Sequence, residues 1–288
     1  MSPSSPRTVL RRLGLKPEKA RGQHFLLHPH QARRIVAALE LAPHDLVVEV
    51  GPGLGALTGF LAEQASRVVA LEVDPVLAAY LREELFPQEP RVEIICQDVL
   101  RFDFRQWAQD AGTPLVVVGN LPYQITSPLL FKLAEDKQAM SRAVLMMQQE
   151  VGARLTAAPS NKDYGILSVL LQYHFAMSRL FSLGPSNFFP PPRVTSVVMR
   201  LAPRPPDPEA RDEAFFAQVV KAAFATRRKT LRNTLAVRAQ ALGLAAPEVL
   251  AALQALDIDP GRRGETLSVA QFVTLSNELL TRREKGGG

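Results

Sequence analysis

The sequence predicts an α/β protein in which a doubly wound parallel sheet is followed by a small all-helical domain. Short apolar runs alternate with helical patterns through the first two thirds of the 288 residues, which is typical of sheets built from β–α units. A proline-rich stretch then interrupts the chain. Beyond it, the apolar residues recur only at helical spacing.

The predicted strands are near-continuous apolar runs, as expected where helices cover both faces of a parallel sheet. They cover residues 46–50, 67–73, 92–96, 115–119, 143–147, about 176–183, and 194–201. Helices are expected at 29–41, at 56–65 and at 75–85, between or before these runs.

The stretch APRPPDPEA (202–210) has four prolines in nine residues, so it cannot continue a strand or a helix and predicts a linker. Helices are expected after it at 212–226, 229–242, 247–255 and 268–280. We therefore expect three parts in the chain. They are a basic N-terminal arm at 1–22, an α/β domain at 23–203 and a helical domain at 209–288.

The composition is that of a globular protein, with 47% hydrophobic and 22% charged residues. Cys96 is the only cysteine, which excludes an intrachain disulfide and favours a reducing, cytoplasmic setting. Its place in an apolar strand predicts a core residue. We find no apolar run long enough for a bilayer, no secretory signal and no zinc-ligand spacing, so we expect neither a membrane segment nor a metal.

Positive charge gathers in two clusters, and the formal net charge is +6. Residues 1–22 carry six Lys or Arg against Glu18 alone, and Arg227, Arg228, Lys229 and Arg232 form a second cluster. Such clusters are typical of nucleic-acid-binding proteins. The alternative is an ordinary solvated surface.

The first strand runs into the glycine-rich segment EVGPGLGALT (49–58). Gly51 and Gly53 allow a tight turn that a ligand can approach closely, and the following helix offers unpaired N–H groups. Glu72 ends the second strand, where a carboxylate can accept from ribose hydroxyls. Asp98 follows the third strand and could accept from an adenine amine. This pattern fits NAD or S-adenosylmethionine; ordinary strand-end carboxylates are the alternative interpretation.

The fourth strand ends in Asn-Leu-Pro-Tyr (120–123). The N6 amine of adenine is a poor nucleophile because its lone pair is delocalised into the ring. Acceptors at its hydrogens, such as the Asn120 side-chain oxygen and the Pro122 carbonyl, would favour the sp³ geometry that attack on a methyl sulfonium requires. Tyr123 would supply a stacking face for the base. The alternative is a proline-containing loop with a core tyrosine.

Taken together, seven segments resemble the ribosomal RNA adenine N6,N6-dimethyltransferase family of the KsgA/RsmA type. The matches run nearly from end to end of the chain. They are GQHFL (22–26), EVGPGLGALT (49–58), LEVD (71–74), QDVL (97–100), GNLPYQITSPLLFKL (119–133), NFFPPPRVTSVV (187–198) and FATRRKTLRNTL (224–235).

The resemblance implies a Rossmann-like methyltransferase domain that binds S-adenosyl-L-methionine, followed by a small helical domain. Phe188, favoured over Phe189, would be the second aromatic wall around the target base. His24 stands where the family usually has asparagine, and an imidazole cannot copy both functions of an amide. The implied cofactor contacts are His24, Leu26, Gly51, Gly53, Glu72, Asp98 and Asn120. The implied residues at the target base are Asn120, Pro122, Tyr123 and Phe188.

The resemblance also implies the reaction, which is dimethylation of the N6 amines of two adjacent adenosines in a hairpin loop near the 3′ end of small-subunit rRNA. We expect a monomer that acts on a nearly mature, pre-30S particle and grips RNA phosphates with Arg227, Arg228, Lys229 and Arg232. Three alternatives stay open: a large-subunit enzyme of the macrolide-resistance type, a non-catalytic ribosome assembly factor, and an NAD-dependent oxidoreductase.

Overall fold

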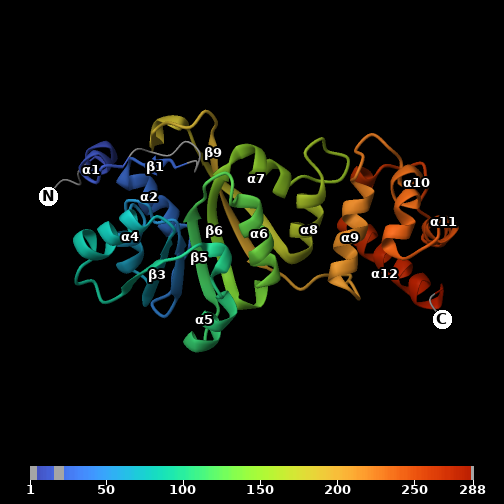
Figure 1. Ribbon diagram of the computed structural model, residues 1–288, viewed down its shortest axis with the longest axis horizontal. Helices are drawn as coiled ribbons and strands as arrows, with labels where there is room; N and C mark the ends of the chain where they lie inside the picture. The colour runs from blue at the N-terminus through green and yellow to red at the C-terminus, as the bar shows by residue number, and fades with distance from the viewer. Residues whose placement is uncertain (1–4, 16–22, 287–288) are drawn as a thin grey trace. The chain divides into compact units, whose positions relative to one another are not determined.

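The structure is a computed structural model that describes residues 5–15 and 23–286 (Figure 1). The chain divides into two compact units. The first comprises Met1–Gly152 and Ala176–Pro203 and contains the sheet. The second comprises Ala153–Phe175 and Arg204–Gly288 and is helical.

The first unit is built on a seven-stranded sheet with the order β4-β3-β2-β5-β6-β9-β7. The strands from β4 to β6 are parallel, and β9 pairs antiparallel with β6. The predicted α/β class is therefore confirmed. The strand bounds are β2 Leu46–Val50, β3 Arg67–Glu72, β4 Val92–Cys96, β5 Leu115–Asn120, β6 Met140–Gln148, β7 Phe175–Leu183 and β9 Ser196–Pro203.

Strand β2 lies at the centre of the parallel part, and every one of its residues is buried. Val50 lies opposite Leu71 of β3 and opposite Gly119 of β5. A Cβ at Gly119 would come within 2.7 Å of the Val50 carbonyl oxygen, so glycine permits this close approach. The carboxyl ends of β2, β3 and β5 therefore meet at one edge of the sheet, where open α/β sheets bind ligands.

Helices α2 (Pro29–Ala37) and α3 (Thr58–Ala62) pack on one face of the sheet. Their buried Ile35, Val36 and Leu61 join Val116 and Val144 of the strands in one apolar cluster. Helix α4 (Pro75–Tyr80) adds a smaller cluster around Ala70 and Ala78. The connections after β4 and β5 contain α5 (Phe104–Ala111) and α6 (Thr126–Glu135); in Figure 1, α6 lies in front of β6, and α5 lies at the lower end of the sheet.

Two very short strands, β1 (Phe25–Leu26) and β8 (Phe188–Phe189), form an antiparallel ribbon apart from the main sheet. Leu26 lies opposite Phe188, and Phe25 lies opposite Phe189. This pairing was not predicted. It joins the beginning of the described α/β unit to a segment near its end.

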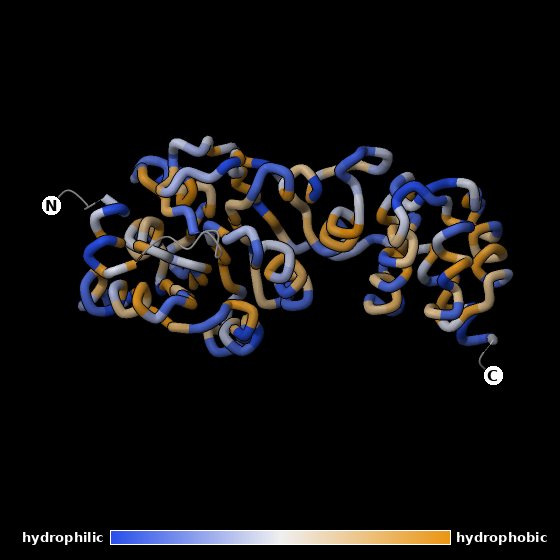
Figure 2. The backbone as a smooth tube through the Cα atoms, turned by 45° about the horizontal axis from the view of Figure 1, so that its top comes forward, coloured by the Kyte–Doolittle hydropathy of each residue, from blue (hydrophilic) through white to orange (hydrophobic). Residues whose placement is uncertain are grey.

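The second unit is formed by the end of α7 (Gln149–Leu155), by α8 (Ile166–His174), and by α9 to α12. Apolar and polar segments alternate along these helices in Figure 2, as expected for amphipathic helices around a core. The helix expected at 229–242 is instead the short α10 followed by a 3₁₀ segment, Ala236–Leu242. The bounds of the later helices are α9 Glu213–Ala223, α10 Leu231–Thr234, α11 Ala246–Ala255 and α12 Val269–Gly286.

The contacts place Ala153–Phe175 with the helical unit, whereas the sequence analysis placed these residues in the α/β domain. Side chains of this segment explain the difference. The Tyr173 ring lies 4.8 Å from that of Phe216, and its hydroxyl accepts from the Ala210 N–H. The Tyr164 hydroxyl donates to the Leu267 carbonyl at 2.9 Å.

One further expectation was wrong. Cys96 is exposed rather than in the core, because it ends β4, the edge strand of the sheet. The described part of the N-terminal arm contains a helix, α1 (Pro6–Arg12), that packs on the first unit. The arm's other basic residues, Lys16, Lys19 and Arg21, lie outside the described residues.

Among the described residues, no single helix has the length and apolar content to cross a membrane; only the bent pair Ala236–Leu242 and Ala246–Ala255 meets that test jointly.

Candidate active site

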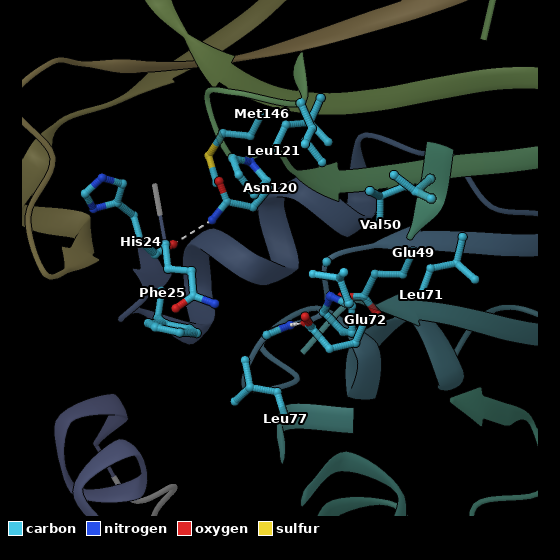
Figure 3. Close-up of a pocket in the computed structure, with 18 of the residues that line it drawn as sticks. His24, Phe25, Glu49, Val50, Leu71, Glu72, Leu77, Asn120, Leu121 and Met146 are labelled. Atoms are coloured by element: carbon cyan, nitrogen blue, oxygen red, sulfur yellow. Dashed lines mark hydrogen bonds between the residues drawn. The ribbon is translucent and has the colours of Figure 1, made fainter. Parts of the chain in front are cut away.

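A cavity opens in the first unit at the carboxyl ends of β2, β3 and β5, and Figure 3 shows a close-up of it. All ten residues that the sequence analysis assigned to the cofactor or the target base line this cavity. They are His24, Leu26, Gly51, Gly53, Glu72, Asp98, Asn120, Pro122, Tyr123 and Phe188.

The glycine-rich turn lies between β2 and α3 and forms one side of the cavity. Gly51 and Gly53 have φ angles of 66° and 58°, a left-handed conformation that other L-residues rarely adopt. At Gly53 there is a second constraint, because a Cβ would lie 3.1 Å from the Phe25 ring. The backbone of this turn is thus exposed to the cavity at positions where a side chain would be strained.

Glu72 is buried at the end of β3 and ties two loops together. Its carboxylate accepts from the Gly53 N–H and from the Asp74 N–H, each at 3.0 Å. Burial raises its pKa, and these two hydrogen bonds act in the opposite direction. Each carboxylate oxygen has a further lone pair that a ribose hydroxyl can use.

Asp98 follows β4 on the same side of the cavity. One of its oxygens accepts from the Leu100 N–H at 2.9 Å, which caps a short 3₁₀ turn. The side chain is half-buried. Its second oxygen is the candidate acceptor for an exocyclic amine.

Asn120 ends β5, and its amide orientation is fixed. The side-chain Nδ2 donates to the His24 carbonyl oxygen at 2.7 Å, drawn as a dashed line in Figure 3. The side-chain oxygen is therefore the acceptor that Asn120 offers to a ligand.

The Pro122 carbonyl was expected to accept from the N6 amine of the target base, but it already has two donors within the turn. It accepts from the Ile125 N–H at 3.2 Å and from the Thr126 hydroxyl at 3.1 Å. Both lone pairs are then engaged within the turn itself. Among the described residues, we find no donor to the carbonyl of the preceding residue, Leu121, which also lines the cavity.

His24, Tyr123 and Phe188 form the aromatic part of the lining. The His24 and Tyr123 rings are 5.6 Å apart at an angle of 38°. The His24 Nδ1–H donates to the Pro190 carbonyl at 2.7 Å, which ties the segment before β1 to the segment after β8. Phe188 is buried and faces the cavity, whereas Phe189 packs in a separate cluster with Phe25.

Glu49 also lines the cavity, and the sequence analysis did not single it out. It lies within β2 and is 1% exposed, and its Oε2 has no hydrogen-bond partner among the described residues. Burial raises its pKa from 4.5 to about 8, and the charge of Glu72 adds to this effect. A glutamate inside the apolar run LVVEV was the signal that could have identified it.

The carboxylate groups that line the cavity fit an adenosine cofactor that carries a positive charge. Glu72 and Asp98 supply acceptors for hydroxyl and amine groups, and the orphaned oxygen of Glu49 suits a cation. A buried carboxyl is stabilised in its ionised form when a cation lies beside it.

Comparison with known proteins now identifies the family. The sequence profile described as ribosomal RNA adenine dimethylase matches residues 14–280. The chain belongs to the ribosomal RNA adenine dimethylase family. The resemblance noted in the sequence is thereby confirmed, and the oxidoreductase alternative is not supported.

Relatives of this dimethylase are similar over nearly their whole length. The ribosomal RNA small subunit methyltransferase A of Geobacter metallireducens is 44% identical over 93% of this chain and 97% of that protein. The protein of the same name from Bacillus cytotoxicus is 41% identical over 99% of this chain and 98% of that protein.

Solved structures agree with the fold of the dimethylase. The 23S rRNA methyltransferase ErmE superposes with a TM-score of 0.65 at 27% identity, over 88% of this chain and 99% of that chain. A dimethyladenosine transferase from Plasmodium falciparum gives 0.75 at 24% identity, over 91% and 98%.

The predicted RNA-contacting cluster of the dimethylase lies in the second unit, where all four residues are exposed. Arg227 is engaged, because its Nε lies 3.2 Å from Glu265 and its guanidinium also donates to the Lys162 carbonyl. We find no ion pair for Arg228, Lys229 or Arg232 within residues 5–15 and 23–286.

Proposed function

We propose that the enzyme transfers methyl groups from S-adenosylmethionine to the N6 amines of two adjacent adenosines near the 3′ end of small-subunit rRNA, yielding N6,N6-dimethyladenosine at both. The observation that carries this proposal is the fixed Asn120 amide, whose oxygen faces a cavity that Tyr123 and Phe188 also line. The relatives named small subunit methyltransferase A support the small-subunit substrate, since they are far more similar to this chain than ErmE is.

The cofactor would be held mainly by the three strand ends. Glu72 would accept from the ribose hydroxyls and Asp98 from the adenine amine, while the turn at Gly51 and Gly53 lies beside the amino-acid part. Bound S-adenosylmethionine supplies an electrophilic methyl on a sulfonium. Glu49 would become ionised beside this positively charged ligand.

The target adenine would be held at the end of β5. The Asn120 oxygen would accept one hydrogen of the N6 amine, and we assign the second acceptor to the Leu121 carbonyl because the Pro122 carbonyl is already engaged. The nitrogen lone pair forms the N–CH₃ bond as the bond from carbon to sulfur breaks. The proton that the amine then loses passes to water. Electrostatic preorganisation of this kind requires no strong base.

Tyr123 would stack on the base that has left its helix. Base–aromatic stacking contributes about 1–3 kcal/mol. Burial raises the pKa of Tyr123, and the Gln148 side chain acts in the opposite direction with a smaller effect. The ring therefore stays neutral.

The direct test is methyl transfer from labelled S-adenosylmethionine to purified small subunits that lack the modification, followed by nucleoside analysis. We expect N6,N6-dimethyladenosine at two adjacent positions. Transfer confined to large-subunit RNA would favour the macrolide-resistance type of enzyme. Tight subunit binding without transfer would favour an assembly factor.

We expect the enzyme to act as a monomer on the pre-30S particle, which mass photometry of the complex would test.

Glu72→Ala should weaken the binding of S-adenosylmethionine at least about tenfold, or ~1.4 kcal/mol. The substitution removes the proposed ribose acceptor and the carboxylate that accepts from the Gly53 and Asp74 N–H groups. Isothermal titration calorimetry measures the change. Glu93→Ala is the matched control, since Glu93 lies on β4 in an ion pair with Arg67 outside the cavity. Equal affinities for wild type and Glu72→Ala would refute the ribose assignment.

A triple Ala variant of Arg228, Lys229 and Arg232 should weaken binding to small subunits. Each of these cations would neutralise about one phosphate. We therefore expect the slope of log affinity against log salt concentration to become shallower by about three. Filter binding at several salt concentrations measures this slope. Arg211→Ala is the control, since Arg211 is exposed in the same unit but paired with Glu284. An unchanged slope would show that the cluster is only a solvated surface.

A further inference from the structure

Helix α1 is encoded by local signals that the sequence analysis overlooked. Ser5 caps it by accepting from the Thr8 N–H, and Pro6 occupies its first turn. Gly14 ends it in a left-handed conformation with φ of 68°. The Leu15 N–H then donates to the Leu10 carbonyl, and the Gly14 N–H donates to the Arg11 carbonyl. This is the Schellman arrangement, and Leu10 and Leu15 make its apolar contact.

A helix of seven residues does not persist in water by itself. Its order must therefore come from the surface on which it packs. Leu10 is 3% exposed and forms a small buried cluster with Phe25 of β1 and Leu77 of α4. Arg12 adds an ion pair with Glu84 at 2.5 Å, and its guanidinium lies 5.7 Å from the centre of the Tyr80 ring.

The residues beneath α1 are also residues of the cavity. Phe25, Leu54 and Leu77 belong to, or pack on, the Leu10 cluster, and the same three side chains line the cavity. Phe25 and Leu77 are labelled in Figure 3. Phe25 has a further constraint, because its ring lies against the position that a Cβ of Gly53 would take. The side chains of Phe25, Leu54 and Leu77 therefore contact α1 on one side and the cavity on the other.

We propose that α1 is a positioning element of the cofactor site: Leu10 holds Phe25 and Leu77 in place, so that docking of α1 and binding of the adenosine cofactor strengthen each other. This inference rests on the proposed function, namely that the cavity binds S-adenosylmethionine. Coupling between two binding events is reciprocal. The cofactor should therefore stabilise α1 by the same factor by which α1 raises the cofactor affinity.

Two measurements on the full chain test this coupling. Calorimetric titration with S-adenosylmethionine should show that Leu10→Ala raises the Kd about tenfold. The matched control is Leu253→Ala, a buried leucine of α11 in the second unit, for which we expect a change of no more than about twofold. Hydrogen exchange of the wild type, with and without S-adenosylhomocysteine, should show slower exchange of the α1 amides in the complex.

The outcomes separate the inference from the function on which it rests. If the wild type binds no S-adenosylmethionine, the proposed function fails together with the inference. If the wild type binds and Leu10→Ala binds equally well, the inference alone is overturned. Hydrogen exchange needs no variant, so it decides even where Leu10→Ala folds poorly: α1 amides whose exchange is unchanged by ligand would overturn the coupling.

Discussion

Asn120→Ala is expected to lower the rate of methyl transfer to ribosomal RNA by about 10²–10³-fold, the usual effect of losing one preorganised polar group at a reacting centre. The variant loses the side-chain acceptor for the N6 amine and keeps only the Leu121 carbonyl. The measurement is single-turnover transfer of labelled methyl to unmodified small subunits at saturating cofactor.

A separate titration shows which step has changed. Asn120 also donates to the His24 carbonyl, so some loss of cofactor affinity is expected, but less than the loss of rate. Asn161→Ala, at an exposed asparagine of the second unit, is the control for a neutral asparagine substitution. Turnover of Asn120→Ala close to that of the wild type would exclude the proposed mechanism.

Glu49→Gln is expected to remove a large pH dependence of stability. The pKa of Glu49 is raised from 4.5 to about 8 in the folded protein, so the folded state binds more protons than the unfolded state between these values. The wild type should therefore lose stability as the pH rises through this window, by about 1.4 kcal/mol per pH unit. The glutamine variant avoids this loss and should be more stable by about 4 kcal/mol at pH 8.

Urea unfolding of the ligand-free protein between pH 5 and pH 8 measures the difference. Trp107 is the only tryptophan of the chain and lies in the first unit, so its fluorescence reports the unfolding of the unit that contains Glu49. Thr58→Val is the control, because the Thr58 hydroxyl lowers the pKa of Glu49 and this variant removes it but keeps the carboxyl group, so the pH dependence should persist. Parallel stability curves for wild type and Glu49→Gln would show that Glu49 is ionised in the folded protein.

The parallel sheet could be predicted because its central strands, β2 and β5, are apolar runs buried on both faces. The expected run at 46–50 matches β2, and that at 92–96 matches β4. The β1–β8 ribbon could not be predicted, since two residues on each side carry no periodicity. The grouping of residues 153–175 with the helical unit depends on tertiary contacts of Tyr164 and Tyr173, which sequence order does not reveal.

The candidate site was predicted mostly from its motifs, and the structure brings those residues together around one cavity. The sequence could not predict which hydrogen bonds the polar groups of the site make. The engagement of the Pro122 carbonyl depends on how the following turn closes on Ile125 and Thr126. Glu49 was overlooked because a single acid in an apolar strand has no spacing pattern, although its burial makes it the most perturbed carboxyl described in the cavity.

The β1–β8 ribbon has a consequence for the order in which the enzyme matures during its own synthesis. Phe188 lines the cavity and pairs with Leu26, more than half of the chain earlier. Contacts of such long sequence separation form late in folding. A nascent chain that has released its glycine-rich turn and its Asn120 turn still lacks Phe188, the proposed second wall for the target base. Each new molecule therefore completes the lining of this cavity only after β8 has left the ribosome.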